Sequence, residues 1–172
     1  MRLTIITISY NSSENTIKLL ESLKNQTNKD FEVIVVDNNS DDIGQLMDYK
    51  TTETNIIYIK NDHNLGFSGG SNVGIKKALQ KGANWVLLLN NDTWVEPGFT
   101  ASLKAELSQS GGVIGLPLIE GDRIAYSGKI EWFKPTLRHV NHPLYAEQLK
   151  RNSNYYAIGG AMAIHREVFE KI

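Results

Sequence analysis

Two asparagines and an aspartate, Asn90, Asn91 and Asp92, come directly after the apolar segment Trp85–Leu89. A carboxylate just beyond a buried strand can hold a divalent ion, and the ion can bridge the phosphates of a ligand. Amide oxygens of asparagine are weaker, neutral ligands. The same cluster is equally typical of a turn or of a helix N-cap. The local sequence therefore leaves both a metal site at Asp92 and a turn aspartate open.

A second aspartate, Asp37, ends the apolar segment Phe31–Val36. An acidic side chain in this position can accept hydrogen bonds from a ribose hydroxyl or from the N–H of a base. The polar run Asn38–Asp42 that follows is also typical of a turn. On its own, this motif favours a turn-initiating aspartate over a ligand contact.

Glycines are dense between Gly66 and Gly74. The stretch matches neither the G-x-G-x-x-G of dinucleotide-binding folds nor the GK[ST] ending of a P-loop. We expect a flexible loop that enters a helix over Val73–Gln80, where backbone N–H groups at the helix N-terminus favour anions. A left-handed turn with close helix packing is the alternative. The segment Tyr10–Ser13 after the first strand lacks glycine, which weighs against a Rossmann dehydrogenase.

A long polar stretch between Trp132 and Asn154, and the residues after it, hold further groups with chemical potential. Histidines that could ligate a metal or act as general bases are His139, His142 and His165. Solvated side chains are the commoner outcome for histidines in polar loops. Aromatic residues that could stack on sugars are Trp132, Phe133, Tyr145, Tyr155 and Tyr156. Packing of these rings back onto the core is the alternative.

Alternating strand and helix signals must position the polar clusters. Strands are predicted over Leu3–Ser9, Phe31–Val36, Ile56–Ile59 and Trp85–Leu89. Helices are predicted from a cap at Asn11–Glu14 to about Gln26, over Ile43–Tyr49, over Val73–Gln80, and from Pro97 to Leu107. Continuous apolar strands alternating with helices predict an α/β fold, with a mostly parallel central sheet and helices on both faces. Such sheets bind ligands beyond the carboxyl ends of their strands, where the clusters at Tyr10, Asp37 and Asn90 lie.

After Gly111 the pattern changes to strands without intervening helices. Strands are predicted over Val113–Ile119, Ile124–Ile130 and Tyr155–Ile158, and a helix over His165–Ile172. We expect one domain over residues 1–172, with a nucleotide-binding half over 1–110 and a smaller, β-rich acceptor-side half over 111–172.

Composition excludes several classes of protein. Lys plus Arg number 18 and Asp plus Glu 19, and this formal charge of −1 argues against nucleic-acid binding. The chain has no cysteine, which excludes disulfides, zinc–thiolate sites and a cysteine nucleophile. No apolar run approaches the about 18 residues of a membrane span. We expect a cytoplasmic protein, with peripheral attachment to the inner face of the membrane left open.

Taken together, these segments resemble the family 2 glycosyltransferases of GT-A fold, particularly their bacterial rhamnosyltransferase-like branch. The matching stretches are Ile6–Asn11, Val35–Ser40, Asn64–Gly74, Leu88–Thr93 with Pro97, and Gly159–Phe169. The resemblance implies an inverting transfer of a sugar from a nucleotide-diphosphate donor, most simply a UDP- or dTDP-sugar. The acceptor it implies is a glycan or a lipid-linked molecule.

The resemblance also implies roles for individual residues. Those that would line the nucleotide sugar are Tyr10, Asn11, Asp37, Asn64, Gly69, Asn72, Asn90 and Asn91. Asp92 matches the last acid of the family's DXD motif and would hold Mg²⁺ or Mn²⁺ on the diphosphate. Asn90 stands where the first acid of that motif is expected. Gly159 and Gly160 would lie on the acceptor side.

In this family the general base is typically an acidic residue of a Gly-Phe-Asp-Glu-like element that follows the stretch matched by Arg166–Ile172. The base is therefore expected beyond Ile172, and the acceptor-side half is expected to be incomplete. A base at Glu120, Asp122 or Glu147 would make this assignment wrong. The competing hypotheses are a non-catalytic nucleotide-sugar-binding module and a nucleotidyltransferase, although the glycine-rich basic loop of the latter is absent after the first strand.

Overall fold

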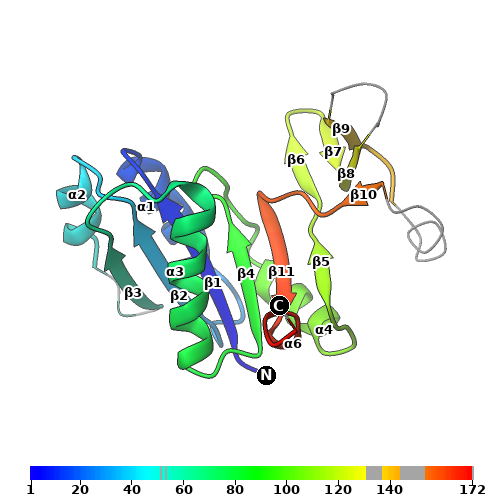
Figure 1. Ribbon diagram of the computed structural model, residues 1–172, viewed down its shortest axis with the longest axis horizontal. Helices are drawn as coiled ribbons and strands as arrows, with labels where there is room; N and C mark the ends of the chain where they lie inside the picture. The colour runs from blue at the N-terminus through cyan, green and yellow to red at the C-terminus, as the bar shows by residue number, and fades with distance from the viewer. Residues whose placement is uncertain (51, 53, 131–136, 144–153, 172) are drawn as a thin grey trace.

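A six-stranded sheet forms the centre of the protein (Figure 1). This computed structural model describes residues 1–50, 52, 54–130, 137–143 and 154–171. The strands of the sheet are β1 (Leu3–Ser9), β2 (Glu32–Asp37), β3 (Asn55–Lys60), β4 (Trp85–Leu89), β5 (Val113–Gly115) and β11 (Ala161–His165), in the order β3–β2–β1–β4–β11–β5. β1 to β4 are mutually parallel, whereas β11 runs antiparallel to both β4 and β5.

Helices cover both faces of this sheet. α1 (Ser13–Lys24), α2 (Ile43–Asp48) and α4 (Phe99–Leu107) pack on one face, and α3 (Gly66–Gln80) and α6 (Arg166–Phe169) on the other. Figure 1 shows α3 crossing in front of β1 and β2, with α1 behind them. Successive buried residues of β2 enter the two cores in turn: Val33 and Val35 face the α1 side, Ile34 and Val36 the α3 side. The predicted α/β fold class is confirmed.

A smaller β-rich region lies beyond the β5 and β11 side of the sheet (Figure 1). β6 (Leu118–Glu120) and β7 (Arg123–Ala125) form an antiparallel pair. β8 (Ser127–Ile130) pairs with both β9 (Leu137–Val140) and β10 (Tyr155–Tyr156). In the part of the chain that the structure describes, no helix has the length and apolar character needed to cross a bilayer.

The glycine-rich segment is helical, and the prediction of a flexible loop there is wrong. α3 begins at Gly66, two turns before the predicted start at Val73. The helix lies so close to the sheet that a Cβ at Gly74 would be 2.5 Å from Cγ2 of Ile6. Tertiary packing therefore outweighs the low helix propensity of glycine. α4 begins at Phe99, two residues later than predicted, so Pro97 precedes the helix and does not form its first turn.

Two predicted strands are each broken in two. The segment 113–119 bends at Leu116–Pro117, where proline cannot donate to a ladder, so β5 joins the main sheet and β6 leaves it. The segment 124–130 changes partner at Tyr126, where β7 ends and β8 begins. The long loop predicted between Trp132 and Asn154 contains β9, and β10 ends at Tyr156.

β11 was not predicted, because its signal is its pairing with β4. Met162 lies opposite Leu88 and Ile164 opposite Val86, residues that are distant in sequence. His165 closes this strand, so the predicted helix over His165–Ile172 is limited to α6, Arg166–Phe169.

Candidate functional site

The three polar clusters meet at the carboxyl edge of the parallel strands. β1 has β2 on one side and β4 on the other, which makes the gap between β1 and β4 the topological switch point of the sheet. Ligands of open α/β sheets bind in the crevice outside such a point. Tyr10 and Asn11 follow β1 there, Asp37 ends β2, and Asn90 follows β4. Tyr10 is half exposed at this edge, with 50% of its surface accessible.

The loops after β1 and β2 are bound to each other. The backbone N–H of Asn11 donates to Oγ of Ser40 over 2.9 Å, and the N–H of Asp41 donates to Oδ1 of Asn11 over 2.9 Å. Asn11 has a φ of 47°, a left-handed conformation that asparagine tolerates. The side chain predicted to line a nucleoside thus holds the neighbouring loop in place through its amide oxygen, and its Nδ2 group has no partner among the described residues.

The start of α1 is capped from the second loop. Oδ2 of Asp42 accepts the N–H of Ser13 over 2.8 Å, and the carbonyl of Asp42 accepts Oγ of Ser13 over 3.0 Å. Ser12, the local N-cap residue, makes no side-chain capping bond, so the cap predicted within Asn11–Glu14 is wrong. Sequence reasoning missed Ser40 and Asp42 as positioning residues. Their signal is their place in a polar run, which does not reveal their partners 29 residues away.

Asp37 has the turn role that its sequence favours, and it also keeps one carboxylate oxygen without a partner among the described residues. Oδ2 accepts the backbone N–H of Ser40 over 2.9 Å and so closes the turn. Oδ1 is buried and has no hydrogen-bond partner among the described residues, in a side chain that is only 3% exposed. Buried polar atoms in folded proteins are rarely left unpaired. One oxygen is therefore structural, and the other is available to a donor from a ligand or from water.

The asparagines after β4 are also tied to the fold. Nδ2 of Asn91 donates to Oγ1 of Thr16 over 3.0 Å, and that hydroxyl donates to Oγ of Ser9 over 3.1 Å, which links the ends of β4 and β1. The N–H of Asn90 donates to the carbonyl of Gly160 over 2.9 Å. Gly160 is buried beside the end of β4, whereas the neighbouring Gly159 is exposed.

Asp92 is exposed, and its carboxylate has no partner among the residues that the structure describes. It lines a cavity of about 760 Å³ between the loop after β4, the start of α4 and the bend between β5 and β6. Within the described ranges, no three His, Asp or Glu side chains gather as metal ligands. A single free carboxylate nevertheless suits Mg²⁺ or a similar ion, which proteins often bind through one or two carboxylates plus substrate phosphates.

Three other residues predicted to contact the nucleotide sugar lie at the start of α3: Asn64 just before the helix, and Gly69 and Asn72 within it. Oδ1 of Asn64 accepts the N–H of Gly66 over 2.8 Å and so caps the helix. A Cβ at Gly69 would lie 2.6 Å from Cβ of Leu65, so this glycine allows the chain to turn into the helix. Asn72 lies exposed one turn later. Asn64 and Gly69 therefore shape the helix N-terminus, whose free N–H groups favour an anion.

A buried asparagine joins α3 to the end of β2. Nδ2 of Asn38 donates to the carbonyl of Gly66 over 3.0 Å, and its Oδ1 accepts Nδ2 of Asn61 over 2.8 Å. A Cβ at Gly70 would lie 3.1 Å from the same Oδ1. The α3 N-terminus is therefore fixed next to Asp37.

The three histidines do not gather. Nδ1 of His139 lies 3.2 Å from Oε2 of Glu120, and Nδ1 of His165 lies 2.8 Å from Oε1 of Glu167. Nδ1 of His142 lies 3.3 Å from the carbonyl oxygen of Pro143. These placements give no joint metal site within the described residues.

The predicted sugar-stacking aromatics divide into two groups. Trp132, Phe133 and Tyr145 lie outside the described residues, as does Glu147. Tyr155 and Tyr156 form β10 and line a cavity of about 290 Å³ in the β-rich region.

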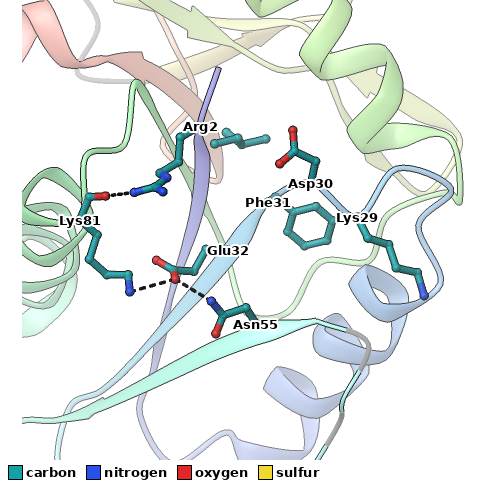
Figure 2. Close-up of a pocket in the computed structure, with 8 residues that line it drawn as sticks. Arg2, Lys29, Asp30, Phe31, Glu32, Asn55 and Lys81 are labelled. Atoms are coloured by element: carbon teal, nitrogen blue, oxygen red, sulfur yellow. Dashed lines mark hydrogen bonds and ion pairs between the residues drawn. The ribbon is translucent and has the colours of Figure 1, made fainter.

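Another cavity, of about 330 Å³, lies at the opposite, amino end of the strands (Figure 2). Oε1 of Glu32 lies 3.2 Å from Nζ of Lys81 and accepts Nδ2 of Asn55 over 2.8 Å, while Arg2 donates to the carbonyl of Lys81. These contacts join β2, β3 and the end of α3. The contacts drawn as dashed lines in Figure 2 thus hold elements together, away from the switch point.

Comparison with known sequences finds glycosyltransferases. The family model described as "Glycosyl transferase family 2" matches residues 4–172. An uncharacterized glycosyltransferase of Haemophilus influenzae is 29% identical over 99% of this chain and 55% of its own length. UDP-Glc:alpha-D-GlcNAc-diphosphoundecaprenol beta-1,3-glucosyltransferase WfaP of Escherichia coli is 34% identical over 54% of this chain and 36% of its own.

Among solved structures, mannosyltransferase PcManGT from Pyrobaculum calidifontis, in complex with GDP-Man and Mn²⁺, superposes with a TM-score of 0.65 over 99% of this chain and 46% of its own. At 16% identity this likeness shows the fold alone. The chain spans about half the length of the Haemophilus relative, 55% of it. The match to the family model covers nearly the whole sequence, and the chain belongs to glycosyl transferase family 2.

Proposed function

We propose that this chain binds the nucleotide-diphosphate sugar of an inverting glycosyltransferase, and that the whole protein transfers the sugar to a glycan or lipid-linked acceptor. The observation that carries the proposal is the buried, unpartnered Oδ1 of Asp37 at the carboxyl edge of the sheet. A ribose hydroxyl or a base N–H would satisfy this oxygen. Tyr10, exposed at the end of the neighbouring strand, would cover the base.

Asp92 is the residue we assign to the divalent ion, Mg²⁺ or Mn²⁺. Its free carboxylate lies just beyond β4, beside the switch point, where the diphosphate of a donor bound at Asp37 would lie. When bound, such an ion stabilises the charge that develops on the leaving diphosphate. A divalent ion is compatible with this fold, since the mannosyltransferase from Pyrobaculum calidifontis is in complex with GDP-Man and Mn²⁺. The N-terminal N–H groups of α3 add a second source of positive potential.

The acceptor would approach from the cavity that Asp92 lines. Inversion requires the acceptor hydroxyl to attack the face of the sugar opposite the diphosphate. We assign none of the described carboxylates as the base for this step: Glu120 is paired with His139, and Asp122 lies exposed in the turn between β6 and β7. The diphosphoundecaprenol-linked acceptor in the name of the Escherichia coli relative supports a lipid-linked acceptor and action at the inner face of the membrane.

A nucleotidyltransferase would need a loop rich in glycine and basic residues after β1. The residues there, Tyr10, Asn11 and Ser12, include neither. A non-catalytic binding module shares the donor site and differs only in lacking transfer, so a transfer assay on the whole protein separates it.

Calorimetric titration with UDP and dTDP tests the role of Asp37. Asp37→Ala should weaken nucleotide binding by about 1–3 kcal/mol, the cost of leaving a buried donor of the ligand unmet. Asp41→Ala is the matched control, because this neighbouring carboxylate is exposed and only the backbone of Asp41 joins the two loops. Unchanged affinity in a folded Asp37→Ala variant would return this residue to a purely structural role.

A further inference from the structure

The cavity of about 290 Å³ in the β-rich region lies between β5, β8 and β10, apart from the carboxyl edge of the parallel strands, where the nucleotide-sugar donor is proposed to bind. Its lining includes three tyrosines, Tyr126, Tyr155 and Tyr156, together with Ser127. Small-molecule sites are typically concave and aromatic, with a few placed polar groups. This lining has that composition.

Ser127 supplies the polar group of this cavity. Its side chain is only 8% exposed, and its Oγ is buried without a hydrogen-bond partner among the described residues. A hydroxyl can donate one hydrogen bond and accept two. Leaving all of them unmade in a buried position is costly. A ligand that carries hydroxyl groups would satisfy Ser127, whereas an apolar ligand would not.

The tyrosines supply flat apolar faces. The phenol ring of Tyr156 lies directly over Gly128, where any side chain on β8 would overlap the ring. Nζ of Lys129 lies 5.8 Å from the centroid of the Tyr155 ring. Both rings are half-buried, so each still offers surface to a ligand. Aromatic faces next to a hydroxyl match a pyranose ring, which has apolar C–H faces and a rim of hydroxyl groups.

We propose that this cavity is a carbohydrate-binding subsite for a sugar ring of the acceptor, remote from the hydroxyl that reacts. The identity of the sugar as the acceptor's rests on the proposed function. Pro117 lines both this cavity and the larger one that Asp92 lines; Val113 and Gly115 line the first, and Leu116 and Leu118, on the α4 side, line the second. An acceptor with two or more sugar units would pass over the β5–β6 segment to reach the tyrosines. The substrate class is an oligosaccharide, free or lipid-linked, that presents at least one sugar beyond the reacting one.

The test is an NMR titration of the ¹⁵N-labelled chain, without nucleotide, using methyl glycosides of glucose, N-acetylglucosamine, mannose, galactose and rhamnose, and N,N′-diacetylchitobiose. We expect at least one sugar to bind saturably with a millimolar Kd and to shift the amides of Ser127, Gly128 and Tyr155. Ser127→Ala should weaken that binding about tenfold, the loss of one hydrogen bond. Tyr155→Ala should weaken it about as much, whereas Tyr155→Phe, which keeps the ring, should bind as the wild type does.

Ser108→Ala is the control, since this exposed serine lies at the end of α4, away from the cavity. The proposal is overturned if no sugar shifts these amides, or if Ser127→Ala and Tyr155→Ala bind like the wild type while folded. A UDP titration with Mn²⁺ on the same sample reports the donor site separately. Sugar binding at Ser127 without nucleotide binding at Asp37 would contradict the proposed donor site and leave the carbohydrate subsite standing.

Discussion

Replacing Gly74 with alanine tests whether α3 lies so close to the sheet that it has no room for a side chain at this position. The new Cβ would lie 2.5 Å from Cγ2 of Ile6 and 3.2 Å from Cγ2 of Val36. Both methyl groups belong to the buried core on the α3 face, so neither can move freely. Either α3 or the two strands must shift.

The size of the effect follows from two opposing terms. Overpacking of a core by one methyl group costs about 1–3 kcal/mol. Alanine in a helix interior is favoured over glycine by about 1 kcal/mol. Gly74→Ala should therefore destabilise the protein by up to about 2 kcal/mol. Gly44 of α2 offers a matched control, because a Cβ there meets nothing within 4 Å.

Urea denaturation followed by circular dichroism measures both variants. Gly44→Ala should be at least as stable as the wild type, because it gains helix propensity and meets no neighbour. The difference between the two variants isolates the contact with the sheet, about 1–3 kcal/mol. Equal stability of Gly74→Ala and Gly44→Ala would refute the reasoning.

Two further predictions concern acidic side chains that join elements. Asp42→Ala should lower the free energy of unfolding by about 1–2 kcal/mol, because α1 loses its cap. Asp48 is an exposed residue of α2, and Asp48→Ala should leave this free energy unchanged. Urea denaturation of the two variants measures the difference. The hydrogen bond from Lys104, and then its charge, hold the pKa of Asp30 below its ordinary value of 3.8. The stability that this pair contributes is therefore present above pH 3.8 and lost as the pH falls through the lowered pKa of the folded state. Asp30→Asn should be less stable than the wild type at neutral pH and equally stable in acid, as measured by thermal denaturation. A loss of stability that persists in acid would contradict the assignment.

The parallel half of the fold could be predicted because its signals are local. The apolar run Leu3–Ser9 is β1 and Trp85–Leu89 is β4, with the bounds that the sequence indicates. Buried parallel strands are continuous apolar runs, so they can be recognised in the sequence without knowledge of the strands with which they pair. The placement of Asp37 and Asp92 at one edge followed from the same pattern.

The rest depended on contacts between distant segments. β11 is a strand because Met162 and Ile164 pair with residues of β4. Nothing within Ala161–His165 alone requires a strand there. Pro117, which cannot donate to a ladder, separates β5 from β6, and β6 then pairs with β7 and not with the main sheet. Tertiary pairing, which overrides local preference, decided both outcomes.

At the site, the sequence indicated which polar residues gather but not which atoms remain free. Asn11, Asn64 and Asn91 look alike as candidate ligand contacts, yet each has a side-chain group engaged by the fold. Asp37 and Asp92 keep an unpartnered oxygen among the described residues. Only loop geometry separates the two groups, and loop geometry depends on residues far along the chain.

Calorimetric titration of UDP in Mn²⁺ and in EDTA, on the wild type and on Asp92→Asn, tests the donor site most directly. The wild type should bind UDP more tightly in Mn²⁺ than in EDTA, and Asp92→Asn should bind with the same affinity in both, because the amide lacks the charge that holds the ion. Asp122→Asn, an exposed acid in the β-rich region, should keep the metal dependence of the wild type. Equal affinity of the wild type in Mn²⁺ and EDTA, or a metal dependence that survives in Asp92→Asn, would contradict a metal-assisted nucleotide-sugar site between β1 and β4.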